Sequence, residues 1–351
     1  MRRRLRVLVL MHEDLVPPER IPGDAKHKLY EWRTERDVLD ALRELGHEAR
    51  PLGVRDDLGV IREALTEFAP DITFNVLEEF GGATAYAQAV ISYLELMRQP
   101  YTGCNPRGLG LAHDKLLTKK ILAYHRVPTP RCAFYPVGAR VRPVRRLRFP
   151  LIVKSSFEDA SLGIAQASVV SSPEKLVERV RFMHERFGTD AIVEEYVEGR
   201  ELYVGVIGNR RLQTLPVWEM TFNRWAEGAP RIATEKVKWD RAYQRAHDIK
   251  TGPAQGLDRA VVTRIERISR QVYRALGLSG YARIDLRLGP DDKVWVLEAN
   301  GTPDLARDED FAESARAAGI EYPALIQRIL NLGLSWRPKW KEVAAAEPAA
   351  G

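Results

Sequence analysis

The stretch Tyr281-Ala-Arg-Ile-Asp-Leu-Arg, followed by Val294-Trp-Val-Leu-Glu-Ala-Asn-Gly-Thr-Pro, decides the fold of this chain. It predicts two β-strands joined by the turn Gly-Pro-Asp-Asp. Apolar Ile284, Leu286 and Leu297 alternate with polar neighbours, so one face of the hairpin requires a core. We therefore expect the polar face to line a cleft rather than to lie on an isolated ribbon.

The polar face of this hairpin carries a set of oxygen ligands. Because strand side chains alternate in direction, Arg283 and Asp285 share one face of the first strand. Glu298 and Asn300 share one face of the second strand for the same reason. Hard oxygen ligands without Cys or His suit Mg²⁺, which completes its coordination with substrate phosphates. The alternative is a solvated hairpin with unrelated charges.

The composition is that of a globular protein with two or three domains. The chain has 351 residues, of which 45% are hydrophobic and 29% charged. No apolar run reaches the length of a membrane span, so we expect no membrane partner. Cys104 and Cys132 form neither a disulfide framework nor a metal set, which favours a reducing cytoplasm.

The net charge of +6 leaves the class of partner open. A basic balance is typical of nucleic-acid binding, but it also suits an anionic small substrate. The arginines are spread along the chain, apart from a run at residues 140–148 that fits a solvated linker. We therefore expect no nucleic-acid partner.

The hydrophobic pattern divides the chain into units. In residues 1–110 the expected strands and helices alternate, which favours an α/β unit with a parallel sheet. They are expected at 5–11, 35–45, 48–54, 58–68, 71–76 and 84–97.

The rest of the chain mixes helices and strands. Residues 111–194 form a second unit, which begins with a helix expected at 111–124. Residues 195–335 form a third unit, in which a strand is expected at 212–218 and the polar stretch 221–254 is long enough for a functional lid. We expect the tail 336–351 to be disordered.

The hairpin resembles the metal-binding end of the ATP-grasp enzymes, specifically the D-alanine–D-alanine ligase branch. That branch has R-x-D on one strand and E-x-N-x-x-P on the next, and the proline here is Pro303. Pro100-Tyr-Thr-Gly and Gly319-Ile-Glu-Tyr-Pro-Ala-Leu are also similar, so the resemblance spans about residues 70–330. It implies an ATP-grasp fold, with a Rossmann-like N-terminal domain and two α+β lobes that hold ATP between them.

The resemblance assigns roles to the hairpin residues. It implies that Asp285, Glu298 and Asn300 hold two Mg²⁺ ions on the ATP phosphates, with Mn²⁺ as an alternative. It also implies that Arg283 and the backbone N–H of Gly301 stabilise a tetrahedral oxyanion. No side-chain nucleophile is required, which fits the absence of a Cys/His or Ser/His motif.

Several lysines are candidates for phosphate contacts. Lys154 ends an apolar strand and is followed by a serine-containing loop, in which Ser161 is a candidate donor. Lys115 follows an aspartate at a helix start, as in the family. Lys238 matches the position of a lid lysine, with Lys236 as a close competitor. Without the resemblance, each of these lysines is expected to be solvated.

The segment Val193-Glu-Glu-Tyr-Val-Glu-Gly-Arg-Glu resembles the hinge between the two lobes of the family. Its first glutamate is implied to accept a hydrogen bond from the adenine amino group, and its last to bind the ribose hydroxyls. Without the resemblance, this acidic run is expected to be a solvated turn. The residues implied in nucleotide binding are Glu194, Glu195, Tyr196, Val197 and Glu201.

The substrate motifs depart from those of true D-alanine–D-alanine ligases. The family has a G-G-x-S-x-E turn after the first strand, but this chain reads Met11-His-Glu-Asp-Leu-Val-Pro-Pro-Glu-Arg. The two partners of the glutamate in that turn, a loop serine and a lid tyrosine, align with Ala160 and Trp239. Glu13 and Glu78 are candidate replacements, although plain solvation is the alternative for each.

The loop implied to bind the second substrate is also altered. Asp304 stands where the family has glycine. Arg307 could receive a carboxylate, and Asp304 or Glu309 an amine, against the alternative of a solvated charged loop. We therefore expect a small carboxylate and an amine other than two molecules of D-alanine.

Three functions are compatible with these residues. The first is an ATP-dependent carboxylate–amine ligase that makes an amide through an acyl phosphate. The second is a kinase or phosphotransferase on the same scaffold, and the third a nucleotide-binding subunit without catalysis. A genuine D-alanine–D-alanine ligase is a further alternative to the first. The resemblance also suggests a homodimer through the first domain, which no sequence feature establishes.

Overall fold

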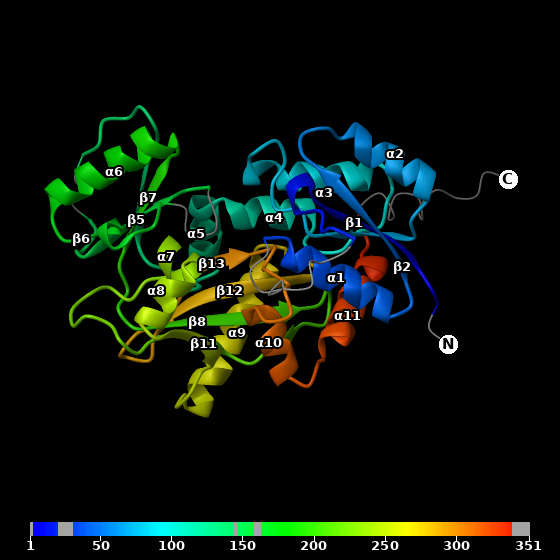
Figure 1. Cartoon of the computed structure of the whole chain (residues 1–351). Coiled ribbons are helices and arrows are strands. Elements are labelled where there is room, and N and C mark those ends of the chain that lie inside the picture. The colour runs from blue at the N-terminus through cyan, green and yellow to red at the C-terminus, as the bar shows by residue number, and fades with distance from the viewer. Residues whose placement is uncertain (1–2, 20–30, 143–145, 158–162, 339–351) are drawn as a thin grey trace.

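The computed structural model describes residues 3–19, 31–142, 146–157 and 163–338, and it contains three β-sheets with helices around them (Figure 1). Within these ranges, no helix combines the length and the apolar character needed to cross a membrane. The expected disordered tail lies outside the described residues from position 339 onward.

The first sheet is the parallel sheet expected from the alternating pattern. Its strand order is β2-β1-β3, and both pairings are parallel. Successive residues of the central strand face opposite sides, so Val7 and Val9 pack in one cluster while Leu10 packs in another. The strands are β1 (Arg6–His12), β2 (Glu48–Val54) and β3 (Ile72–Asn75).

Helices cover both faces of this sheet. Apolar residues of α2 and α3 pack on one face, and those of α1 on the other. The C-terminal helix α11 packs beside α1 on the same face, although it is far away in the sequence (Figure 1). The elements are η1 (Glu13–Leu15), α1 (Arg33–Glu44), α2 (Gly59–Phe68), η3 (Thr84–Tyr86), α3 (Ala87–Leu96) and α11 (Tyr322–Ser335).

Two helices replace the single helix that the sequence predicted at residues 111–124. They are α4 (Pro106–His113) and α5 (Lys115–Tyr124). Asp114 between them has extended backbone angles, and its carboxylate caps α5 by accepting from the backbone N–H of Leu117 at 2.8 Å. The prediction was wrong because an aspartate that caps a new helix interrupts the apolar periodicity only slightly. The domain boundary expected at residue 110 falls inside α4.

The second sheet is antiparallel, with the strand order β4-β7-β5-β6. Helix α6 packs its apolar residues against it, and the expected cap is present, since Ser172 accepts from the backbone N–H of Lys175 at 3.3 Å. The elements are β4 (Cys132–Tyr135), β5 (Leu151–Ser155), η4 (Gln166–Ser168), β6 (Val169–Val170), α6 (Pro173–Phe187) and β7 (Ala191–Glu195).

The third sheet is also antiparallel and has the order β11-β10-β8-β12-β13, with β9 paired to β8. The strand predicted at residues 212–218 is divided between β9 and the start of β10, because Pro216 has no N–H to donate to a ladder. The elements are β8 (Arg200–Ile207), β9 (Gln213–Thr214), β10 (Trp218–Phe222), α7 (Glu235–Trp239), α8 (Arg241–Ala246), β11 (Ile249–Pro253), α9 (Arg259–Ala275), β12 (Tyr281–Leu288), β13 (Val294–Asn300) and α10 (Asp310–Ala317).

The predicted hairpin is confirmed, and it contains a bulge that the sequence did not predict. β12 and β13 pair antiparallel, and the register shifts between Asp285 and Leu286. As a result Leu286 lies opposite Val296, and Val296 takes the buried position that was expected for Leu297. Leu297 is only half-buried. Ile284 packs in the core that α9 covers, as expected.

Candidate active site

A cavity of about 1950 Å³ lies where the three sheets meet. Its lining comes from all three parts of the fold. The first contributes residues after β1 and at the start of α1, the second contributes η4, and the third contributes α7, the hairpin and the loop after it. Lining residues discussed below include Arg33, Glu35, Lys238, Arg283, Glu298 and Asn300.

The hairpin places the four expected polar residues opposite one another. Asp285 pairs with Glu298 and Arg283 pairs with Asn300 in the register of β12 and β13, so all four share one face. The Arg283 guanidinium donates to both carboxylate oxygens of Asp285, at 2.7 and 2.9 Å. The Asn300 side-chain oxygen accepts from the backbone N–H of Thr302 at 2.8 Å.

This donor set fits a divalent cation of the magnesium type. It offers two carboxylates and one amide oxygen on adjacent strands, with no sulfur or imidazole ligand among them. Within the described residues, no group of three His, Cys, Asp or Glu side chains is arranged as a metal site. The candidate set contains only two such side chains, so its third protein oxygen must come from Asn300.

The charge on Glu298 is held by several cations. Burial alone would raise the pKa of this carboxyl, but Lys115, Lys154, Lys238 and Arg283 outweigh burial and lower the pKa to about 2. The closest recorded pair joins Lys115 Nζ to Glu298 Oε2 at 3.8 Å. Glu298 is therefore ionised at neutral pH, as a metal ligand must be.

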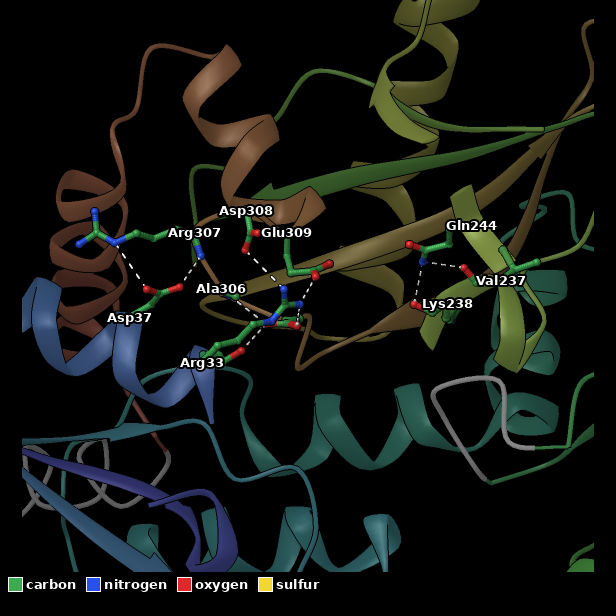
Figure 2. Close-up of polar contacts among 11 residues, drawn as sticks. Arg33, Asp37, Val237, Lys238, Gln244, Ala306, Arg307, Asp308 and Glu309 are labelled. Atoms are coloured by element: carbon green, nitrogen blue, oxygen red, sulfur yellow. Dashed lines mark hydrogen bonds and ion pairs between the residues drawn. The ribbon is translucent and has the colours of Figure 1, made fainter. Parts of the chain in front are cut away.

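The same electrostatics distinguish the two lid lysines. Both Lys236 and Lys238 line the cavity from α7. Burial raises the pKa of Asp285 overall, and the charge of Lys238 is among those that oppose this rise. The same lysine is one of the cations that lower the pKa of Glu298, and Lys236 is not among the leading influences on either carboxyl. The side-chain amide of Gln244 in α8 donates to the carbonyls of Val237 and Lys238 in α7, at 2.9 and 3.1 Å (Figure 2).

A buried ion-pair network lies at the expected adenine position. Glu194 is 1% exposed, and Lys154 and Lys119 approach its two carboxylate oxygens at 3.5 and 3.3 Å. Burial would raise the pKa of Glu194, but the two lysines together lower it. Lys119 also donates to the hydroxyl of Thr129 at 2.8 Å. The sequence did not single out Lys119, although it lies one helical turn after Lys115 on α5.

The other hinge residues have different surroundings. Glu195 faces away from Glu194, and its carboxylate accepts from the backbone N–H of Arg148 at 3.0 Å. Glu201 is 7% exposed, and it accepts from Tyr203 at 2.9 Å and from Arg287 at 2.7 Å. The Arg287 guanidinium also lies over the Tyr196 ring, 5.4 Å from its centroid. Val197 follows Tyr196 and is half-buried.

Gly301 and Ser161 are the two remaining candidates that the resemblance implies near the reacting groups. Gly301 follows β13 directly, and an added Cβ would lie 3.2 Å from Leu109 and 3.3 Å from Cys104, so the backbone is closely packed there. Ser161 lies outside the described residues.

Of the two candidate carboxylates near the first sheet, one lines the cavity and the other does not. The carboxylate of Glu13 pairs with Arg55 at the surface, and Glu13 is not among the residues that line the cavity. Its strand ends one residue earlier, and the η1 turn directs the side chain outward. Glu78 does line the cavity, and its side chain is exposed.

In the loop after the hairpin, too, one candidate residue lines the cavity and another does not. Arg307 contacts Asp37 of α1 (Figure 2). It also pairs with Glu44 and stacks over Tyr322, and it is not among the residues that line the cavity. Asp304 lines the cavity, and it accepts from the hydroxyl of Thr34 at 2.7 Å.

Comparisons with known proteins agree with this geometry. Residues 138–331 match the family model described as the D-ala D-ala ligase C-terminus. An uncharacterized protein of Sinorhizobium fredii, y4sG, is 33% identical over 86% of this chain and 87% of its own length. A D-alanine–D-alanine ligase of Desulforudis audaxviator is 32% identical over 86% of this chain and 92% of its own length.

Solved structures have the same fold. The crystal structure of D-alanine–D-alanine ligase from Bacillus anthracis complexed with ATP superimposes with a TM-score of 0.72 at 21% identity. It covers 97% of this chain and 99% of the other. The ligase from Coxiella burnetii gives a TM-score of 0.69 at 15% identity, over 97% of each chain. The ATP-grasp fold expected from the hairpin is thereby confirmed.

Proposed function

The chain belongs to the D-alanine–D-alanine ligase family of ATP-dependent C–N ligases, and on that premise we propose that it joins a small carboxylate to an amine through an acyl phosphate. The observation that carries the proposal is the register of the hairpin. It brings Asp285, Glu298 and Asn300 together beside Arg283, at the wall of the large cavity. The intact set argues against a binding subunit without catalysis.

The proposed reaction has two steps. In the first, a carboxylate oxygen of the substrate attacks the γ-phosphorus of ATP, and ADP leaves with the bonding electron pair. In the second, a neutral amine attacks the acyl carbon, inorganic phosphate leaves, and the nitrogen loses a proton. Neither step needs a side-chain nucleophile, so the protein contributes positioning and charge stabilisation.

The acidic and basic residues of the site have different proposed roles. Asp285, Glu298 and Asn300 would hold Mg²⁺, two ions in our proposal, and when bound this metal neutralises phosphate charge. Lys115, Lys154 and Lys238 would bind the phosphates. Arg283, now bonded to Asp285, would turn toward the oxyanion together with the N–H of Gly301.

The nucleotide contacts come from the hinge. Glu194 and Glu201 would accept from adenine and ribose, while the backbone at Glu195 with Tyr196 and Val197 would border the ring. Glu194 is held in place by Lys119 and Lys154, which supports its use as a fixed acceptor.

We propose substrates other than two molecules of D-alanine. The G-G-x-S-x-E turn is missing, and Glu13, a candidate replacement in that segment, pairs with Arg55. Asp304 lines the cavity where the family has glycine. A genuine D-alanine–D-alanine ligase is the second candidate, because the relative from Desulforudis audaxviator carries that name.

We place the enzyme in the cytoplasm, where ATP is supplied, and we propose a homodimer through the first domain.

The test is ADP release from ATP and Mg²⁺ in the presence of pooled amino acids, amines and small carboxylates, with mass spectrometry of the products. We expect ADP together with a mass equal to two pool members minus water. A phosphorylated product without condensation would contradict the ligase and favour a kinase. Condensation of D-alanine with itself as the main product would contradict the proposed substrate difference.

A further inference from the structure

One part of the cavity is lined by carboxylates from two distant segments of the chain. Glu35 comes from α1, and the others come from the loop after β13 and the start of α10. The guanidinium of Arg33 lies among them. We call this region the acidic end, and define it as Arg33, Glu35, Asp304, Asp308, Glu309 and Asp310.

The guanidinium of the acidic end is already engaged by three carboxylates. Arg33 contacts Glu309 closely, and it lies 3.4 Å from Asp308 and 3.5 Å from Asp304 (Figure 2). Only 12% of its side chain is exposed. A carboxylate on a substrate would have to displace one of these three partners to reach Arg33. This region therefore disfavours binding of an anionic group.

Glu35 provides a second, independent observation that points to a ligand. It is 4% exposed and lines the cavity, yet its Oε2 atom has no hydrogen-bond partner among the described residues. A buried oxygen without a partner is costly unless a ligand supplies a donor. Burial raises the pKa of Glu35 to about 7, and repulsion from Asp304 adds to this rise, so a backbone hydrogen bond and the charge of Arg33 do not fully offset them.

We propose that the acidic end binds a protonated amino group of the amine substrate, and that this substrate is a diamine or polyamine. A group held among carboxylates stays protonated and cannot attack, so a second, neutral amine of the same molecule must reach the acyl phosphate. The acidic end and Arg283 line one cavity, and the charge of Asp310 acts on Arg283, so both ends of such a molecule fit one site.

This inference rests on the proposed ligase function and names the class of its amine substrate. An amino acid fits less well, because its carboxylate would face Asp304, Asp308 and Glu309 with Arg33 already occupied. The carboxylate substrate fits less well for the same reason. The basic side of the cavity, with Lys238 and Arg283, suits that substrate better.

The test compares ligands of equal size that differ in whether they carry ammonium groups. Isothermal titration of the full-length protein with ADP and Mg²⁺ would use putrescine and its uncharged isostere 1,4-butanediol. We expect putrescine to bind at least about ten-fold more tightly, and Glu35→Gln to reduce the ratio to about three-fold or less. Asp40→Asn is the matched control, because it removes a half-exposed carboxylate of the same helix that does not line the cavity.

Several results would overturn the inference. They are equal affinities, tighter binding of 1,4-butanediol, no putrescine binding at millimolar concentration, or a putrescine preference that survives in both Glu35→Gln and Glu309→Gln. Preference for γ-aminobutyrate over pentanoate, without preference for putrescine over the diol, would assign the acidic end to the carboxylate substrate and would also overturn it.

The two proposals fail in different ways. ADP and a condensed product formed equally well from monoamines would leave the ligase standing and defeat the diamine. Selective putrescine binding without condensation in any pool would support the acidic end and defeat the ligase.

Discussion

The two ends of the cavity treat the same residue type in opposite ways. We call the hairpin residues Arg283, Asp285, Glu298 and Asn300 the metal end. There the charges of Lys115, Lys154, Lys238 and Arg283 outweigh burial and lower the pKa of Glu298 to about 2. At the acidic end, burial and the neighbouring Asp304 raise the pKa of Glu309 to about 7, although Arg33 contacts it. Burial acts on both carboxyls in the same direction. The balance of fixed charges around each carboxyl therefore decides its ionisation, and with it the ligand that each end can bind.

Asp285→Asn should break the metal end with the largest effect. We expect at least a thousand-fold loss of kcat, or about 4 kcal/mol, because the amide is a weak ligand for a hard cation. ADP release measures the loss, and circular dichroism checks that the variant folds, since Arg283 also loses its partner. Full turnover in the folded variant would contradict the assigned metal role.

Glu35→Gln should change how the stability of the acidic end depends on pH. The folded protein holds a proton on Glu35 up to about pH 7, whereas the unfolded chain releases it near pH 4.5, so wild-type stability falls as the pH rises through this interval. The variant lacks this loss. We expect its unfolding free energy, relative to wild type, to increase by about 3 kcal/mol across the interval and then level off.

Urea unfolding of both proteins at several pH values measures this difference. Asp40→Asn serves as the control, because its carboxylate is 41% exposed and pairs with Arg36 at the surface. A Glu35→Gln difference that stays constant with pH would show that Glu35 is not buried as described.

Lys119→Met should weaken the buried ion pairs around Glu194, the implied adenine contact, by removing one of its two cations. Glu194 would keep Lys154 but lose its second cation, so we expect a loss of about 2 kcal/mol in stability and a higher KM for ATP. Lys120→Met on the same helix is the control, because that lysine is exposed and should change stability by less than about 0.5 kcal/mol. Equal effects of the two variants would argue against the network.

Lys238→Ala should have the smallest effect, which separates the two lid lysines. We expect about a ten-fold loss in kcat/KM, or about 1.4 kcal/mol, because Lys238 acts on the metal carboxylates and would contact phosphate. Lys236→Ala is the matched control on α7, and it should lose less than about three-fold. The reverse order in steady-state kinetics would assign the phosphate contact to Lys236.

The sequence predicted the metal end better than the rest because its information is local. The alternation of Arg283 with Asp285, and of Glu298 with Asn300, places four side chains on one face once the two strands pair. The bulge at Leu297 was not predictable from alternation, since an extra residue changes the register without changing the composition. Arg307 was misplaced because nothing in its loop indicates that α1 supplies Asp37 and Glu44 as partners.

The sequence alone therefore determined most of the elements, the parallel first sheet and the polar face of the hairpin, because periodicity and strand pairing act over short stretches. Only the tertiary structure decided that Arg33 and Glu35 meet Asp304 and Glu309, which lie about 270 residues later in the chain. It also decided that Lys119 joins Glu194. The physical reason is that burial and charge balance depend on neighbours brought together by packing, which no local pattern records.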